Sequence, residues 1–413
     1  MSEASPTKSD ASGGGDHPSA SRHVVLALAM CQLTSWGVLY YAVTGLIFAI
    51  NQETGWSHAE ILAGPMVALV TSSLVSPAVG RIIDQGLGRL VLNLGTLVGC
   101  CSLMLWAWAE TYPLYIAAWI VIGVAQAMSL YDAAFAVMIH RLGTAAKRPI
   151  VAVTLVGGFA GSVFVPLAYS MSAVVGWRMA VVLLAGLLSL NVAWQVFVLP
   201  KAQAMNKEDS PPPGLKMSPD LFLNLNFWLG AASFTALAAA FSIVTFHLIP
   251  MLVANGMSEK IASYVFALIG PSQVLARLML LWLPSARPWR LALALHAFLV
   301  LSFVLMVTSD ATVLWMAVVM YGLSNGLQTL LRPQLIWTLF GTQFFGSVNG
   351  ALALPQQLIK AVAPFAAAHL VSTDSSYFGL NMLLLGLAGI SGVSLVVAFW
   401  YSVSSGHQDG RRG

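Results

Sequence analysis

The chain of 413 residues contains 19 Lys and Arg and 15 Asp and Glu, so that 8% of its residues are charged and 58% are hydrophobic. Because a soluble domain carries about 25% charged residues, this composition excludes a water-soluble enzyme, a disordered protein and a nucleic-acid-binding protein. A membrane-spanning helix needs roughly 20 apolar residues, so the hydrophobic content is sufficient for about twelve spans.

Hydrophobic runs bounded by charged or turn residues predict an all-α membrane protein with twelve transmembrane helices. The runs lie at residues 24–50, 61–83, 90–109, 114–139, 150–175, 179–199, 221–252, 261–283, 291–308, 313–338, 348–372 and 378–402. Residues 1–21, rich in Ser, Gly and Ala, predict a disordered cytoplasmic tail, and residues 403–413 predict a second tail. Residues 200–220 include three consecutive prolines and predict a cytoplasmic linker. This linker would join an N-terminal six-helix bundle, 22–199, to a C-terminal six-helix bundle, 221–402.

The basic residues concentrate on one side of the predicted membrane. With both termini in the cytoplasm, 14 Lys and Arg lie on the cytoplasmic side, and Arg178 and Lys260 lie on the opposite side. Because Lys and Arg favour cytoplasmic loops, we predict a multi-pass protein of the inner membrane with both termini cytoplasmic. The net charge of +4 then reflects topology and requires no nucleic-acid partner.

The two halves repeat sequence features at a nearly constant offset. A Gly-x-x-Gln-Ala motif from Gly123 recurs as Gly-x-x-Asn-Gly from Gly322, and Pro166 recurs as Pro364. A third match links the loops after the first and seventh spans. A duplicated unit around a central cavity is the architecture that alternating access requires.

The loop between the second and third spans reads Gly80-Arg81-Ile82-Ile83-Asp84-Gln85-Gly86-Leu87-Gly88-Arg89. It resembles the loop motif of the major facilitator superfamily, Gly-x-x-x-Asp-Arg-x-Gly-Arg, in the variant with one extra residue before the final Arg. The matching residues, which the resemblance implies are gating residues, are Gly80, Asp84, Gly88 and Arg89. The Arg that usually follows the Asp is replaced by Gln85. Ion-pair and helix-end contacts of Asp84 and Arg89 could latch the cytoplasmic side shut; the alternative is a solvated turn whose arginines only set the topology.

Three further segments resemble the monocarboxylate-porter-like branch of this superfamily. They are Trp36-Gly37-x-x-Tyr40-Tyr41, His247-Leu248-Ile249-Pro250 and Gly270-Pro271-Ser272-Gln273-Val274-Leu275-Ala276-Arg277. Porters of this branch place Asp-x-x-x-Arg in the eighth span, where the Arg holds the substrate carboxylate and the Asp takes part in proton coupling. Arg277 matches that Arg, whereas Gln273 stands at the position of the Asp. The Lys in the first helix of the branch has no equivalent here.

Four charged residues fall inside the predicted spans, namely Asp132, Arg277, Arg332 and Lys360. A charge at bilayer depth costs at least about 2.5–3.5 kcal/mol on insertion scales, so each of the four is a functional candidate. Three positive charges against one negative charge favour an anionic small-molecule substrate.

Arg277 is the leading substrate-binding candidate, because its guanidinium can hold a carboxylate through two parallel hydrogen bonds. Gln273 lies one turn earlier on the same helix face and could orient it. The alternative is an arginine that snorkels to the cytoplasmic interface. Tyr40, Tyr41 and Asn325 could also contact the substrate, although Asn325 could instead hydrogen-bond helices together. Consecutive helix positions diverge by about 100°, so we expect only one of the two tyrosines to face the site.

The remaining intramembrane groups have several possible roles. Lys360 could be a second anion contact, a proton-linked group or the partner of an acid. Asp132 and Arg332 occupy nearly equivalent positions in the two halves, which predicts a salt bridge that acts as an inner gate. Alternatively, Asp132 carries the coupled proton. His247 titrates near physiological pH and is the second proton-coupling candidate, unless it is a hydrogen-bonded interfacial histidine.

These features predict a secondary active transporter, not an enzyme, that moves a small organic anion with a proton by alternating access. We expect a monomer in the lipid bilayer, without a metal or cofactor. Two alternatives stay open. The first is efflux of a drug-like solute or a metalloid, in which Cys31, Cys100 and Cys101 would face the cavity instead of packing as small apolar residues. The second is a membrane sensor or scaffold that does not transport.

Overall fold

A computed structural model of the chain describes residues 18–142, 147–198, 223–281, 288–308, 310–340, 345–374 and 377–409. These residues form helices joined by short turns. The predicted linker and most of the predicted N-terminal tail lie outside the described residues. The first helix begins at Pro18, inside the predicted tail, and the last helix continues past residue 402 to Asp409.

The helices before residue 199 pack against one another. Helix α4 contacts α5 and α8, α3 contacts α5, and α1 contacts α7 and α8. The bounds of these elements, with η marking π-helical turns, are α1 Pro18–Trp36, η1 Gly37–Tyr41, α2 Ala42–Thr54, α3 His58–Ile82, η2 Ile83–Leu87, α4 Gly88–Ala107, α5 Tyr112–Ser129, α6 Tyr131–Leu142, α7 Lys147–Gly157 and α8 Ala160–Val198. We refer to them together as the N-terminal bundle.

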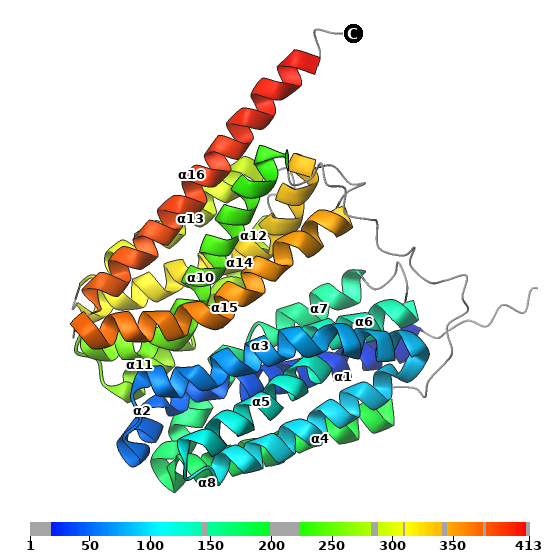
Figure 1. The fold of residues 1–413 in the computed structure, drawn as a ribbon, viewed down its shortest axis with the longest axis vertical. Coiled ribbons are helices and arrows are strands. Elements are labelled where there is room, and N and C mark those ends of the chain that lie inside the picture. The colour runs from blue at the N-terminus through cyan, green and yellow to red at the C-terminus, as the bar shows by residue number, and fades with distance from the viewer. Residues whose placement is uncertain are drawn as a thin grey trace, which may run out of the picture.

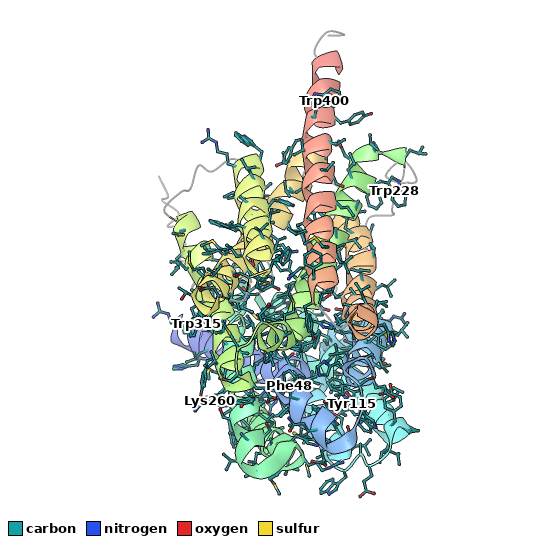
Figure 2. The ribbon with its side chains drawn as sticks, turned by 90° about the vertical axis from the view of Figure 1, so that its left-hand side faces the viewer. Phe48, Tyr115, Trp228, Lys260, Trp315 and Trp400 are labelled. Carbon is teal, nitrogen blue, oxygen red and sulfur yellow. The ribbon has the colours of Figure 1, made fainter. Side chains whose placement is uncertain are left out.

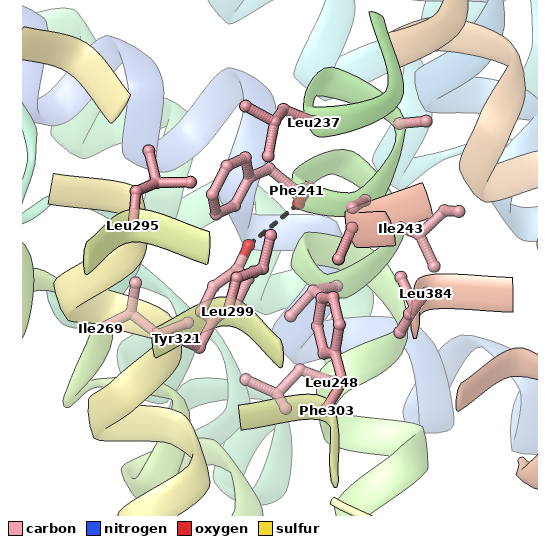
Figure 3. Close-up of a cluster of buried hydrophobic side chains, with 14 of the residues drawn as sticks. Leu237, Phe241, Ile243, Leu248, Ile269, Leu295, Leu299, Phe303, Tyr321 and Leu384 are labelled. Carbon is pink, nitrogen blue, oxygen red and sulfur yellow. Dashed lines mark hydrogen bonds between the residues drawn. The ribbon is translucent and has the colours of Figure 1, made fainter. Parts of the chain in front are cut away.

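The helices after residue 224 form the second group, the C-terminal bundle. Helix α10 contacts α15 and α16, α13 contacts α14 and α16, and α12 contacts α14. In its core, the Tyr321 hydroxyl donates a hydrogen bond of 3.1 Å to the carbonyl oxygen of Phe241 among buried leucines (Figure 3). The bounds are α10 Leu225–Ala254, α11 Glu259–Phe266, α12 Ile269–Leu281, α13 Pro288–Leu305, α14 Ala311–Phe340, α15 Phe345–Asp374 and α16 Phe378–Asp409.

Two predicted boundaries between spans are tight glycine turns and not loops. Gly86 in η2 has φ of 85°, and Gly176 inside α8 has φ of 79°. Only glycine adopts this left-handed region without a Cβ penalty. The chain therefore reverses direction between the second and third predicted spans, and between the fifth and sixth, while remaining almost continuously helical.

Eight stretches of the described residues are long and apolar enough to cross a membrane. Two of them, His58–Ala107 and Pro149–Val198, have 50 residues each, and each covers two predicted spans. Large apolar side chains, including Trp228, Trp315 and Trp400, lie exposed on the outside (Figure 2), as suits a lipid-facing surface. The all-α membrane fold is thereby confirmed, whereas the number of twelve spans stays a prediction.

The two bundles converge on the side of α2 and α11 and diverge on the opposite side (Figure 1). Helix α3 contacts α15, α8 contacts α11 and α12, and α2 contacts α10. On the converging side, Thr44 Oγ1 donates to the carbonyl oxygen of Thr245 at 3.4 Å, and Phe246 and Ala368 enter the apolar core of the N-terminal bundle. With the predicted topology, this converging side would be the outer side of the membrane.

Candidate functional site

A small cavity is lined by residues of both bundles. The lining residues are Tyr41, Gly158, Gly161, Ser162, Thr245, Phe266, Ile269, Gly270, Gln273, Tyr321 and Asn325. Three of the residues predicted to contact substrate, Tyr41, Gln273 and Asn325, are among them. The other three, Arg277, Lys360 and Tyr40, are not among the lining residues. The structure thus brings together side chains that the sequence places in the first, eighth and tenth spans.

The backbone is irregular where three helices border this cavity. Tyr41 ends the π-helical turn η1, Gly158 follows the end of α7, and Ala267 and Leu268 separate α11 from α12. Pro271 has no N–H to continue the helix toward Ala267. The N–H of Gly270 instead donates to Ser162 Oγ in the N-terminal bundle at 2.9 Å. Breaks of this kind are frequent at functional sites, and here one of them links the bundles.

Arg277 extends from α12 toward the N-terminal bundle. Its Nη1 donates to the carbonyl oxygen of Thr154 and its Nη2 donates to Gln273 Oε1, both at 3.4 Å. Its Nε is buried and has no hydrogen-bond partner. The guanidinium also interacts electrostatically with Tyr41 and Tyr131. The side chain therefore lies between the bundles and not at the lipid-facing surface.

An aromatic cluster continues from the cavity into the N-terminal bundle. The ring of Tyr41 lies 4.9 Å from that of Tyr40 and 6.4 Å from that of Trp36, and Trp36 lies 5.0 Å from Tyr131. Tyr40 is buried against Phe246, with ring centroids 5.3 Å apart. Tyr41 lines the cavity and Tyr40 does not appear in its lining, as the 100° offset predicts.

The sequence analysis did not identify three residues of this region: Phe266 and Tyr321, which line the cavity, and Tyr131, which interacts with Arg277. The sequence spacing could have identified two of them. Tyr321 lies four residues before Asn325 and shares a helix face with it. Phe266 lies seven residues before Gln273, which is two helical turns in the predicted span. Tyr131 starts α6, directly after Leu130, whose extended backbone follows the end of α5 at Ser129.

The charged residues at the diverging side form a group across the bundles. Asp132 lies in the first turn of α6, where a negative charge is stabilised by the helix dipole. It interacts electrostatically with Lys360 of α15, which in turn interacts with Arg332 of α14. Among the described residues, Asp132 forms no ion pair within 4.0 Å. Asp132 therefore does not form the predicted salt bridge with Arg332 in this structure, and the role of the pair as an inner gate stays a prediction.

His247 lies in the converging part of the C-terminal bundle. Its Nε2 is 2.9 Å from the carbonyl oxygen of Pro364, and since a carbonyl only accepts, Nε2 carries the proton. Its Nδ1 is buried without a partner. His247 is not among the cavity-lining residues, so the geometry favours a packing role over proton transfer with the substrate.

The motif loop lies on the diverging side. A Cβ on Gly88 would lie 2.5 Å from Cγ2 of Val137, so Gly88 allows α4 to approach α6. Gly80 has no atom within 4 Å of such a position. Within the part of the chain that the structure describes, neither Asp84 nor Arg89 forms an ion pair. The predicted latch role of Asp84 and Arg89 stays a prediction.

The cysteines lie away from the cavity. Cys31 is buried with its Sγ 4.0 Å from the carbonyl oxygen of Asn191, and Cys100 Sγ lies 3.5 Å from that of Ala185. Cys101 is exposed on α4. Among the described residues, no group of three His, Cys, Asp or Glu side chains could hold a metal ion.

Comparison with known proteins identifies the family. A family model described as Major Facilitator Superfamily matches residues 24–364, whereas no curated protein sequence matches. The nucleoside transporter NupG is 15% identical, with a TM-score of 0.71 over 93% of this chain and 98% of that chain. A bacterial homolog of the human lysosomal transporter Spinster, inward-facing and occupied, is 12% identical, with a TM-score of 0.70 over 94% of this chain and 98% of that chain.

At these identities the solved structures show a shared fold alone. The family model, in contrast, covers more than half of the sequence. The chain belongs to the Major Facilitator Superfamily and is a multi-pass membrane transporter that carries small molecules across a lipid bilayer.

Proposed function

We propose that this transporter moves a small organic anion, a carboxylate, together with a proton by alternating access. The observation that carries the proposal is Arg277, a guanidinium held between the bundles with an Nε that has no partner. A buried polar atom without a partner requires an explanation. A carboxylate that accepts two parallel hydrogen bonds from the guanidinium supplies one.

The surroundings of Arg277 support a neutralising ligand. Within the described residues, no carboxylate lies within 4.0 Å of its nitrogens; its neighbours are the carbonyl of Thr154, the amide of Gln273 and two tyrosines. A charge at this depth is tolerated only when it is compensated. The resemblance to monocarboxylate porters supports the same role for Arg277, although Gln273 cannot carry the proton that the Asp of that branch handles.

Asp132 is our candidate for proton coupling. It interacts with Lys360 of the opposite bundle, and a proton on Asp132 would remove this attraction. Protonation would thus change the free-energy difference between the open and closed arrangements of the diverging side, which is what coupling requires. From the distribution of Lys and Arg, we further propose an inner-membrane location with both termini in the cytoplasm.

Uptake into proteoliposomes tests the proposal. Labelled carboxylates would be supplied under an imposed pH gradient to the wild type, to Arg277→Gln and to Arg277→Lys. We expect uptake that depends on the gradient, that is lost in Arg277→Gln, and that is weakened in Arg277→Lys because an ammonium lacks the planar fork. Arg290→Gln is the matched control, since Arg290 is an exposed arginine on α13. Equal uptake through Arg277→Gln and the wild type would refute the assignment.

The alternative of metalloid efflux receives less support. It requires sulfur ligands in the translocation path, yet none of the cysteines is among the cavity-lining residues. Export of an organic anion would use the same Arg277 site, so the direction of transport is a separate question that the imposed gradients in proteoliposomes would answer.

A further inference from the structure

We infer that Ser162 caps helix α12 from the opposite bundle and thereby positions Arg277 at the boundary between the bundles. The N–H of Gly270, the second residue of α12, donates the capping bond to Ser162 Oγ at 2.9 Å. Ser162 itself belongs to α8 of the N-terminal bundle. The expected effect on transport rests on the proposed function, because it acts through Arg277 as the anchor of the anion, whereas the expected effect on the position of α12 does not.

The start of α12 needs a hydrogen-bond acceptor that the residue before it does not supply. The first four N–H groups of a helix have no partner within the helix, and a Ser, Thr, Asp or Asn directly before the helix often accepts one of these bonds. Ser57 does so for α3, and Ser258 does so for α11. The residue before α12 is Leu268, whose side chain has no acceptor. Ser162 replaces the missing cap, because its oxygen accepts the bond of the second N–H, which a capping side chain commonly takes.

Glycine at position 270 makes this close approach possible. A Cβ on Gly270 would overlap Ser162 Oγ, and it would lie 3.1 Å from Ser162 Cβ and 3.3 Å from the carbonyl oxygen of Gly158. That carbonyl belongs to the backbone between α7 and α8, so it cannot rotate away as a side chain does. The break between α7 and α8 therefore faces the break between α11 and α12 across the boundary, and a side chain at position 270 would push the two apart.

The capped face of α12 also carries Arg277. Gly270, Gln273 and Arg277 have the i, i+3, i+7 spacing of one helix face, and all three lie in α12. Gly270 bonds Ser162 at one end of this face. Arg277 bonds the carbonyl oxygen of Thr154 at the other end, about 10 Å further along the helix. A shift of the start of α12 would therefore move the guanidinium relative to the N-terminal bundle.

A cap that comes from the other bundle exists only while the two bundles are close at this level. Removing an N-cap changes the ratio of capped to uncapped molecules by about 2- to 30-fold. If the substrate binds Arg277 in the capped position, its apparent affinity falls with the fraction of molecules that are in this position. The capping bond thus connects the arrangement of the bundles to the affinity of the proposed anion site.

Three substitutions of Ser162 separate the hydrogen bond from packing. Ser162→Ala removes the acceptor, Ser162→Thr retains it, and Ser162→Val has the shape of Thr without the acceptor. The cavity that Ser162 lines has room for about one water molecule, which leaves space for the added methyl group. Ser189→Ala is the matched control, because Ser189 is an exposed serine on the same helix and bonds the carbonyl oxygen of Gly186 in that helix.

The position of α12 would be measured without substrate, on the purified full chain, by double electron–electron resonance between spin labels on α7 and α12. Val151 and Met279 are suitable label sites, being 51% and 55% exposed, on a chain whose three cysteines are replaced by serine. We expect Ser162→Ala and Ser162→Val to increase the population at longer distance about 2- to 30-fold relative to the population at the original distance. Ser162→Thr and Ser189→Ala should leave the distances unchanged.

Uptake of labelled carboxylates into proteoliposomes would measure the effect on transport. Ser162→Ala and Ser162→Val should raise KM by up to about 30-fold and keep the maximal rate within about twofold of the wild type, since Arg277 itself is intact. Ser162→Thr and Ser189→Ala should keep the wild-type KM. A variant that merely folds poorly would lower the maximal rate and leave KM unchanged.

The outcomes separate this inference from the proposed function. Unchanged distances in Ser162→Ala, or equal distances in the Thr and Val variants, would overturn the capping role. Changed distances with an unchanged KM would overturn the positioning of Arg277 by Ser162. If the distances change as expected while Arg277→Gln takes up carboxylates as well as the wild type, the carboxylate proposal is refuted and the capping role of Ser162 is supported.

Discussion

Substituting alanine for Gly326 should destabilise the C-terminal bundle and displace the proposed anion site. A Cβ at this position would overlap the backbone carbonyl oxygen of Gln273 and would lie 2.8 Å from Gln273 Cα and 2.9 Å from Ala276 Cβ. Two of these atoms belong to the backbone of α12 and cannot rotate away. Helix α12 must therefore move from α14, and it carries Gln273 and Arg277 with it.

The size of the effect follows from the contact. Inserting a methyl group into a packed interface costs about 1–3 kcal/mol. For a bundle of roughly 200 residues, each kcal/mol changes Tm by about 2–4 °C, so the Tm of Gly326→Ala should lie about 2–12 °C below that of a Gly→Ala control without the overlap. Gly386→Ala is the control, because Gly386 lies on α16 and no atom lies within 4 Å of its added Cβ. Both substitutions gain about 1 kcal/mol of helix propensity, so their difference isolates the overlap.

Thermal unfolding in detergent, followed by tryptophan fluorescence, would measure this difference, and uptake of labelled carboxylates into proteoliposomes would report on the site. We expect Gly326→Ala to have the lower Tm and the slower uptake, and Gly386→Ala to keep the wild-type uptake. If Gly326→Ala melted at or above Gly386→Ala, the close packing of α14 on α12 would be wrong, and so would the placement of Gln273 that depends on it.

Three further changes give different outcomes. Arg178→Ala removes an ion pair of 2.7 Å with Glu53 and bonds of 2.8 and 3.1 Å to the carbonyls of Ala107 and Ala109; since the pair is partly exposed, we expect a loss of about 1–2 kcal/mol in thermal unfolding with unchanged substrate affinity. Replacing all three cysteines by serine should leave uptake unchanged, and abolished uptake would favour metalloid transport. Asp132→Asn should retain exchange of substrate across proteoliposomes but lose accumulation driven by a pH gradient; accumulation at the wild-type level would exclude Asp132 as the proton carrier.

Much of the architecture was predictable because lipid imposes simple constraints. Apolar runs had to become helices, since backbone polar groups in a bilayer must bond within the segment. The lipid environment also marks Arg277 as a functional candidate in the sequence itself, because a charge inside the membrane is energetically costly. The spacing of four residues linked Gln273 to Arg277, and Gln273 is among the cavity-lining residues.

The contacts between the bundles were not predictable in this way. The bond from Arg277 to the carbonyl of Thr154 joins residues 123 positions apart, and Thr154 has no charge or motif that marks it. The extended backbone at Leu130, which precedes Tyr131, occurs inside an apolar run that has no Pro and whose one Gly, Gly123, lies seven residues earlier. Periodicity reports which face of a helix is apolar, but it does not report which helix of the other bundle that face meets.

The contacts of Arg277 connect substrate binding to movement of the bundles. In this structure, Arg277 bonds a carbonyl of the opposite bundle, and Gly270 bonds Ser162 across the same boundary. A guanidinium has five N–H donors, so a carboxylate can bind it through Nε and a second nitrogen. If this turns the guanidinium away from the Thr154 carbonyl, binding exchanges a contact between bundles for a contact with substrate. A ligand shifts a conformational equilibrium only through its different affinity for the two states. If Arg277 is the anchor, this exchange is a local source of that difference, because the bond to Thr154 exists only while the two helices are close.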